Sequence, residues 1–376
     1  MPFPTICAEA IVNNFSLEWR LELTKSIPYL KELSLTLNSV EFGENQVEIN
    51  GTVHKLGVYR QYPEGQPIPR EHQQDNERGG FSKDLDSNGA IVRNSKLLDG
   101  DVQLIPRNMW VEGSSLSTET NPPFKRLLQY TIKEPNGTTT IKRFEYNRPL
   151  HEAFKSLNTK MFGGYAFSII VKDFSIKWGL HVIPLPVGVT FTVQNLTIGS
   201  STYLGSPSLR EMLTKNKKIR VLDVDYGRGN DGFRDDFSLF ETCHTALFRD
   251  FQADRADRLE KITNMKNHEI VIASPARRFT NQFIEIIRTR IRNCPPTGQK
   301  FTVEFYDVPS VQYLLQNIET EFQDRPAVNC PLLLEIDNQP NLQLEVSYTS
   351  EAWGGWRRRE RVVIEAKRKS FKRKLV

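Results

Sequence analysis

The sequence's closest approach to a chemical motif is G-x-G-x-x-G at residues 227–232. It follows a segment with strand character and precedes one with helical character, the context in which glycines bring backbone close to a pyrophosphate. Three carboxylates occupy the region where a phosphate would bind, those of Asp231, Asp235 and Asp236. The sequence therefore predicts a polar loop here and no nucleotide site.

The same region also resembles the start of a calcium loop. Asp223, Asp225 and Asp231 have the spacing of the first acidic ligands of an EF-hand. Counting from Asp223, the sixth position, which requires glycine, is Arg228, and the twelfth, which requires a bidentate glutamate, is Arg234. We therefore expect no calcium site.

Cys243 and His244 invite comparison with a thiol protease. Adjacent residues on a helix point about 100° apart, so these two cannot form a nucleophile–base pair with each other. The sequence also lacks G-x-S-x-G, H-E-x-x-H and Walker A motifs. Its four cysteines are scattered, without a C-x-x-C pair. We expect no catalytic residues, no metal site and no cofactor, and a non-enzymatic protein.

Composition suggests a folded intracellular protein. The chain has 376 residues, of which 22 are Phe, 11 Tyr and 5 Trp, enough aromatic area for a substantial core. No apolar run approaches the roughly 18–20 residues that cross a bilayer. The N-terminus does not resemble a secretory signal, and scattered cysteines fit a reducing compartment. We expect the cytoplasm or nucleus.

The order of hydrophobic patterns indicates four regions. Residues 1–37 have spacings of three and four, which predict two short helices at 4–14 and 17–26. Residues 38–120 begin with period-two alternation around the turn signal Asn50-Gly51 and continue as a long, poorly structured loop. Residues 121–350 begin with a hairpin around 135–137 and a short helix, and then alternate between strands and helices. Residues 351–376 form a basic tail.

The alternation of strands and helices after residue 167 predicts an α/β fold with a largely parallel sheet. Strand-like runs are predicted at 167–176, 189–198, 219–226, 268–274, 300–306, 332–336 and 342–348. Helical runs are predicted at 207–215, 235–251, 280–293 and 310–322. The uneven recurrence of the strands allows either an irregular leucine-rich-repeat-like solenoid or a compact sandwich.

The positive charge is concentrated at the C-terminus. Residues 357–376 carry a charge of +8, so the remainder of the chain sums to −3. A solvated, frayed terminus, a nuclear-import signal and a patch for nucleic acid or an anionic membrane all fit this pattern. The residues that would bind an importer or an anion are Arg357, Arg358, Arg359, Lys367, Arg368, Lys369, Lys372, Arg373 and Lys374.

Several phrases, taken in order, resemble the nematode F-box C family of F-box-associated proteins. The resemblance covers roughly 350 residues, and its specificity comes from the order of the phrases. They are RLELTKSIPYLKEL (20–33), SVEFGENQVEINGTVHKLGVYRQYP (39–63), DNERGG (75–80), Gly-Asp-Val (100–102), NPPF (121–124), RFEYNRPLHEAFKSLN (143–158), LHVIPLPVGVTFTVQNLTI (180–198) and EVSY (345–348).

The resemblance implies an F-box-like segment near the N-terminus and an F-box-associated α/β region behind it. F-box helices bind a Skp-type adaptor of a cullin ubiquitin ligase, and the associated region recruits an unknown protein substrate. The adaptor-facing residues implied are Pro4, Ile6, Ile11, Phe15, Leu17 and Leu21. We therefore expect a substrate-recruiting subunit, with a nuclear or nucleic-acid-associated protein acting through the basic tail as the alternative.

Overall fold

The computed structural model divides the chain into two compact units, residues 1–217 and 218–376, and each is described here by itself. The described residues are 23, 35–92, 96–106, 123–165, 168–213, 219–226, 238–241, 243–249, 256–273, 279–293, 295–305, 308–324, 326, 331–336, 339, 341–352 and 358–369. The helices predicted at 4–14 and 17–26, the six adaptor-facing residues and the glycine motif at 227–232 lie outside these ranges.

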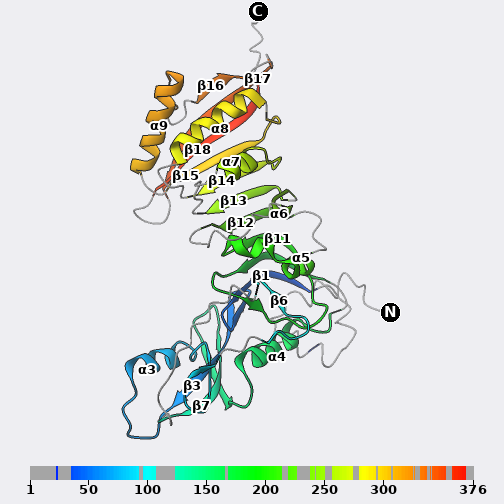
Figure 1. The fold of residues 1–376 in the computed structure, drawn as a ribbon, viewed down its shortest axis with the longest axis vertical. Coiled ribbons are helices and arrows are strands. Elements are labelled where there is room, and N and C mark those ends of the chain that lie inside the picture. The colour runs from blue at the N-terminus through cyan, green and yellow to red at the C-terminus, as the bar shows by residue number, and fades with distance from the viewer. Residues whose placement is uncertain are drawn as a thin grey trace, which may run out of the picture. The chain divides into compact units, whose positions relative to one another are not determined.

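The first unit contains a mixed sheet with the strand order β11-β9-β1-β2-β3-β7-β8 (Figure 1). Strands β1, β9 and β11 are parallel, and β1 continues through β2, β3, β7 and β8 in antiparallel steps. The strands span Thr36–Gly43 (β1), Gln46–Ile49 (β2), Thr52–Gln61 (β3), Lys125–Lys133 (β7), Thr139–Glu145 (β8), Ile169–Ile176 (β9) and Phe191–Ile198 (β11).

The hairpin predicted at Asn50-Gly51 is confirmed. Asn50 has a φ of 51° and Gly51 a φ of 85°, the left-handed pair that a tight turn between twisted strands requires. This turn joins β2 to β3. The second predicted hairpin is confirmed as well, since β7 and β8 pair around the turn at 134–138.

Shorter elements complete the first unit. The helices are α3 (Arg70–Glu77), α4 (Leu150–Phe162) and α5 (Pro207–Met212), with a 3₁₀ turn at Ser201–Gly205. Two two-stranded pieces pair β4 (Asp84–Leu85) with β5 (Ile91–Val92), and β6 (Val102–Gln103) with β10 (Val182–Ile183).

The long loop predicted before residue 120 is wrong for its described part, because α3 and strands β4 to β6 lie there. The polar residues of this segment form tertiary hydrogen bonds, which its composition alone did not indicate. The amide of Asn76 accepts from the backbone N–H of Arg60 at 3.0 Å and donates to the Arg60 carbonyl at 2.9 Å. Gln129 donates to the Asn76 carbonyl at 3.0 Å. Buried polar side chains therefore order a segment that has few apolar residues.

Aromatic packing forms the core of the first unit. Phe42 of β1, Phe174 of β9 and Phe191 of β11 form a row of neighbouring rings on the sheet, with centroids 5.0–5.8 Å apart. Phe162 of α4 packs on Phe42 and Phe191, with ring centroids 6.0 and 5.7 Å away. All four side chains are buried. The predicted helix over 151–162 is confirmed, and this contact fixes α4 to the sheet.

The second unit contains a sheet with the order β16-β17-β18-β15-β14-β13-β12. Strands β12 to β15 are parallel, each beside its predecessor in the chain, whereas β15, β18, β17 and β16 pair antiparallel. The strands span Val221–Asp225 (β12), Thr245–Arg249 (β13), Glu269–Ala273 (β14), Lys300–Phe305 (β15), Leu332–Glu335 (β16), Leu342–Ala352 (β17) and Arg358–Arg368 (β18).

Helices α6 (Ser238–Glu241), α7 (Ala256–Thr263) and α8 (Phe279–Asn293) connect the parallel strands, and α9 (Val308–Phe322) follows the last of them. The described chain is thus a mixed α/β protein in which strands dominate, with a large sheet. The predicted helices at 207–215, 280–293 and 310–322 are confirmed in α5, α8 and α9.

Two predictions for this unit are wrong. Residues 235–251 were expected to form one helix, but they contain α6 and strand β13, because Ala246 and Phe248 alternate with less buried neighbours and pair with strands on both sides. A frayed C-terminus is wrong for residues 358–368, which form β18 between β15 and β17. Buried Val362, Ile364 and Ala366 alternate there with the less buried Val363, Glu365 and Lys367, which is a strand pattern that the net charge concealed.

Candidate protein-binding surface

The two faces of the second unit's sheet differ in chemistry. One face carries apolar residues in register across six strands, all fully buried: Leu222, Ala246, Ile270, Phe301, Ile364 and Val346. Helix side chains with the same degree of burial, such as Phe283 of α8 and Leu314 of α9, complete this core. Helix α9 contacts β15 and β18 directly. This face therefore holds the unit together.

The opposite face, which we call the polar face, is formed by the alternate residues of the same strands. Its outer row runs through Asp225, Arg249, Ala273, Glu304, Arg361 and Thr349 in register. Two further rows carry Asp223, Leu247, Val271, Thr302, Val363 and Ser347, and Thr245, Glu269, Lys300, Glu365 and Glu345. Polar residues outnumber apolar ones in these rows, and the central positions Val271, Ala273 and Thr302 are buried.

Ion pairs cross the polar face, and two of them join a buried acid to a more exposed arginine. Arg249 is 56% exposed and donates from Nε to Asp223 Oδ1 at 2.8 Å, whereas the Asp223 side chain is 9% exposed. Arg361 donates to Glu304 in the same way at 2.9 Å, with exposed fractions of 28% and 4%. Guanidinium groups therefore form the outer layer, where they can contact a partner.

The pKa of Asp223 reflects the opposing effects of burial and of its ion pair with Arg249. Burial raises the pKa of Asp223, and the hydrogen bonds from Arg249 oppose this without cancelling it, so the pKa lies above its ordinary value. The Asp223 carboxylate is thus engaged with Arg249. Within the described residues, no group of three or more His, Cys, Asp and Glu side chains could hold a metal ion.

A line of buried polar side chains positions the strands that carry the polar face. Asn267 donates to the carbonyls of Phe240 at 2.6 Å and Cys243 at 2.7 Å. Gln299 donates to the carbonyls of Met265 at 2.8 Å and Asn267 at 2.9 Å. Each side chain lies just before a strand and bonds to the turn that precedes the neighbouring strand. The repeated contact sets the register of β13, β14 and β15.

Cys243 belongs to this line and not to a reactive site. Its thiol is buried and donates to the Phe240 carbonyl, and burial raises the pKa of the Cys243 thiol to about 12. His244 is exposed and stacks on His268, with ring centroids 4.4 Å apart. The two neighbours therefore point into different environments, although they precede β13 and do not lie on the helix that was predicted.

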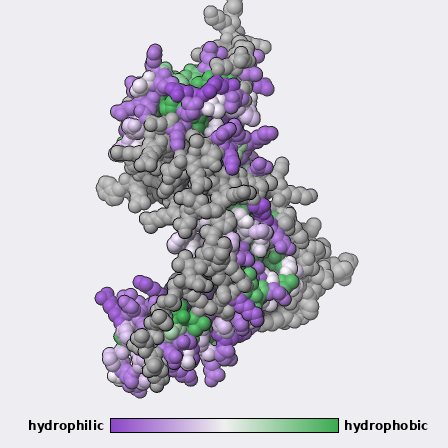
Figure 2. All heavy atoms as spheres, in the orientation of Figure 1, coloured by the Kyte–Doolittle hydropathy of each residue, from purple (hydrophilic) through white to green (hydrophobic). Residues whose placement is uncertain are grey.

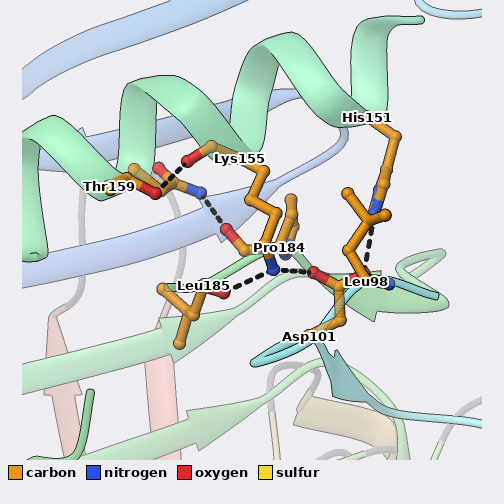
Figure 3. A network of polar contacts seen from close by, with 8 residues as sticks. Leu98, Asp101, His151, Lys155, Thr159, Pro184 and Leu185 are labelled. Atoms are coloured by element: carbon orange, nitrogen blue, oxygen red, sulfur yellow. Dashed lines mark hydrogen bonds and ion pairs between the residues drawn. The ribbon is translucent and has the colours of Figure 1, made fainter. Parts of the chain in front are cut away.

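In the first unit, the densest polar network surrounds Asp101, and it connects α4 to two loops (Figure 3). Asp101 accepts hydrogen bonds from His151 at 2.7 Å, from Lys155 at 2.5 Å and from the backbone N–H of Leu98 at 2.8 Å. Lys155 also donates to the carbonyl of Leu185 at 2.7 Å. Burial alone would raise the pKa of Asp101, but these hydrogen bonds outweigh it and lower the pKa.

This network has a structural role, since it joins α4 to two loops of the first unit. The Asp101 carboxylate is 1% exposed and is surrounded by donors, so it is poorly placed to abstract a proton from a substrate. Asn158, one turn further along α4, donates to the Pro184 carbonyl at 2.7 Å. Because residues 151, 155 and 158 lie on one face of α4, their hydrogen bonds hold the two loops against the helix.

The predicted basic residues are only partly accessible to anions. Lys367 Nζ lies 2.7 Å from Glu345 Oε1, and Lys369 Nζ lies 2.8 Å from Glu335 Oε1. Arg368 is exposed, and Arg358 and Arg359 belong to β18. Arg357, Lys372, Arg373 and Lys374 lie outside the described residues, and the anion-binding role remains a prediction.

The sequence interpretation missed the polar face entirely. The sequence pattern that indicates this face is the alternation of buried and charged residues along strands such as 358–368. An interpretation based on net charge did not detect that alternation. On the face of the molecule seen in Figure 2, the described side chains are mainly hydrophilic, with hydrophobic ones in small separate patches. Such a surface favours a partner protein that binds through polar contacts over one that docks into a single apolar groove.

Comparisons with known proteins identify one region. Residues 149–307 match the family described as a domain of unknown function (DUF3557). No curated protein and no solved structure matches the chain. None of the helices in the described ranges is both long enough and apolar enough to cross a membrane. The matched residues begin just before α4 and end just after β15.

Proposed function

We propose that the chain is a non-catalytic, substrate-recruiting F-box-type subunit of a cullin ubiquitin ligase. The N-terminal segment binds the Skp-type adaptor, and the polar face binds the substrate. The observation that carries the second part is the layering of the polar face, in which exposed arginines lie over buried acids. Arginine in this setting is a frequent anchor of protein interfaces.

The strand topology supports a recruiting role. Val221, Thr245 and Glu269 are register partners, so β12, β13 and β14 repeat every 24 residues. Parallel strands that follow one another in chain order, with helices on one face, are the arrangement of an irregular leucine-rich-repeat-like solenoid. In such solenoids each repeat adds side chains to one continuous binding surface. We therefore favour the solenoid interpretation over the sandwich.

The resemblance to the F-box C family supports the ligase context. The DUF3557 match covers two of the phrases on which that resemblance rests, 180–198 wholly and 143–158 in part, and it assigns them no activity. The alternative function, nucleic-acid or nuclear association through the basic C-terminus, is less favoured. Lys367 and Lys369 already pair with carboxylates, which lowers their attraction for phosphates.

A pull-down with a recombinant Skp-type adaptor tests the first half of the proposal. We expect the full chain to be retained and the Ile11→Asp and Leu21→Asp variants to be lost, because a charge in an aliphatic contact is not solvated. Lys160→Glu, an exposed change on α4, is the matched control. No retention of the full chain, while a known F-box protein is retained, would contradict adaptor binding.

Variants of the polar face test the second half separately. In cells, Arg249→Glu with Arg361→Glu should abolish co-purification of substrates while leaving adaptor retention unchanged. Lys266→Glu, an exposed substitution outside the polar-face strands, is the control. If the arginine variant keeps every partner of the wild type, then the polar face does not recruit substrate, whatever the result for the adaptor.

A further inference from the structure

Strand β8 (Thr139–Glu145) is the terminal strand of the first unit's sheet and has one free edge. Among the described strands it pairs only with β7, and all seven of its residues are exposed. Its register with β7 is continuous from Thr139 to Glu145, so no bulge interrupts the edge, and the strand contains no proline. Edges of this length are templates for a further strand.

The turn before β8 determines which backbone groups face the free edge. Glu134 donates its N–H to the carbonyl of Thr138 at 2.9 Å, so this pair is hydrogen-bonded across the hairpin. In an antiparallel ladder, such pairs alternate with pairs whose polar groups point outward. The N–H and C=O groups of Ile141 and Arg143 therefore point away from β7, toward the free edge.

The side chains along this edge are apolar and basic. Ile141 is 46% exposed and Phe144 is 50% exposed, each on a different face of the strand. The hairpin 125–145 holds five Lys and Arg against two Glu. Arg126 and Arg143 are engaged with Leu85 and Gln129, whereas Lys142 has no carboxylate partner among the described residues.

We propose that the β8 edge binds an extended acidic segment of a partner protein by strand addition. Backbone hydrogen bonds to Ile141 and Arg143 supply the pairing, and Lys142 selects acidic side chains. Ile141, on the opposite face of the strand from Lys142, provides a contact for the apolar residues that alternate with those acids. This inference goes beyond the proposed function, because it rests neither on adaptor binding nor on the polar face.

A second copy of this chain is a poorer occupant of the edge. Two β8 strands paired antiparallel about their centres would place Lys142 opposite Lys142. Like charges directly opposite each other destabilise a strand pair. An acidic strand meets the opposite situation, so charge favours a different partner over self-association.

Fluorescence anisotropy with the full chain tests the proposal. The probe is a fluorescein-labelled peptide of eight residues that alternates glutamate and valine. Two control probes are a lysine–valine peptide and a glutamate–valine peptide N-methylated at every second residue, which cannot donate along one edge. We expect binding of the first probe and a loss of binding for both controls.

Variants of β8 assign that binding to the edge. Lys142→Glu should weaken it about tenfold, because a repulsive charge replaces an attractive one. Ile141→Pro should abolish it by removing an outward N–H, while Ile141→Ala retains most of it. Lys160→Glu is the charge control and should bind as the wild type does. Far-UV circular dichroism shows whether Ile141→Pro is folded, and if it is not, the methylated probe replaces that variant.

Three results would overturn the proposal. The first is no binding of the glutamate–valine probe at about millimolar protein. The second is equal binding of the methylated probe, or equal losses for Lys142→Glu and Lys160→Glu, either of which means non-specific charge attraction. The third is a dimer in sedimentation velocity that Ile141→Pro dissociates, which identifies the edge as a self-association surface.

Discussion

The side-chain amide of Asn267 donates a hydrogen bond to the backbone carbonyl of Cys243, which lies 24 residues earlier in the chain. The same nitrogen is 2.6 Å from the Phe240 carbonyl, so one buried amide binds both carbonyls of the preceding turn. Gln299 repeats the contact one strand further on. Register in the second unit is therefore held by buried polar groups as well as by apolar packing.

Asn267→Ala should destabilise the second unit locally. It leaves the Cys243 carbonyl without its side-chain donor, at a cost of about 1–3 kcal/mol, whereas the Phe240 carbonyl keeps the N–H and thiol of Cys243 as donors. We expect amide hydrogen exchange in β13 and β14 to accelerate about tenfold, since about 1.4 kcal/mol corresponds to a factor of ten. Asn264→Ala changes an exposed asparagine three residues away and is the control. Equal exchange in the two variants would mean that the Asn267 contacts contribute nothing.

The elements with strong local periodicity could be predicted from the sequence. Helices α4, α8 and α9 and strands such as β11 and β14 follow their hydrophobic spacing, and the β2–β3 turn follows from Asn50-Gly51. The local hydrophobic spacing was enough to predict these elements, because their buried faces are apolar and their ends carry turn residues.

Other elements depend on contacts that are distant in sequence. Strand β13 has helix-compatible residues and becomes a strand because β12 and β14 lie on either side of it. Strand β18 lies beside β15, more than 50 residues earlier, and this pairing cannot be read from composition. The ordering of α3 depends on Asn76 bonding to Arg60, so a polar segment appeared structureless. The polar face follows from these pairings, which is why the sequence did not reveal it.

Asp101→Asn should lower the free energy of unfolding by about 2 kcal/mol at pH 7. The change removes a buried negative charge from the Lys155 ammonium and weakens the hydrogen bond with His151, and Lys155 is 16% exposed, so solvent offsets part of the cost usual for broken buried pairs. Urea denaturation followed by circular dichroism measures the loss. Asp99→Asn, an exposed neighbour, should have almost no effect. Similar losses for both variants would contradict a specific role of the network.

The Asp101 contribution should also depend on pH in a defined direction. Its pKa is lowered by folding, so the folded state favours the carboxylate. The stabilisation is complete above the ordinary pKa of about 4 and is lost as pH falls through the lower folded value. The difference between the wild type and Asp101→Asn should therefore shrink below about pH 4. A difference that stays constant down to pH 3 would contradict this assignment.

His54 predicts a second pH effect in a different range. Burial lowers the pKa of His54 from 6.5 to about 4, and its Nδ1 lies 2.8 Å from the Tyr130 hydroxyl. Below pH 6.5 the unfolded chain binds a proton that the folded chain does not, so stability is full above pH 6.5 and falls as pH drops toward 4. The total loss is about 3 kcal/mol. His54→Gln should flatten the stability profile between pH 6.5 and 4, whereas His268→Gln, at an exposed site, should not.

The Cys243 thiol should resist alkylation in the folded protein. Burial raises its pKa to about 12, so the reactive thiolate is almost absent at pH 8, and the side chain is 6% exposed. We expect iodoacetamide to leave the Cys243 peptide unmodified over an hour in buffer and to modify it completely in urea, as measured by mass spectrometry. Asn267→Ala should restore labelling in buffer, because Asn267 Nδ2 lies 3.2 Å from the Cys243 sulfur and covers the same turn. Rapid labelling of the wild type would contradict the buried environment, and protection that survives Asn267→Ala would show that packing alone shields the thiol.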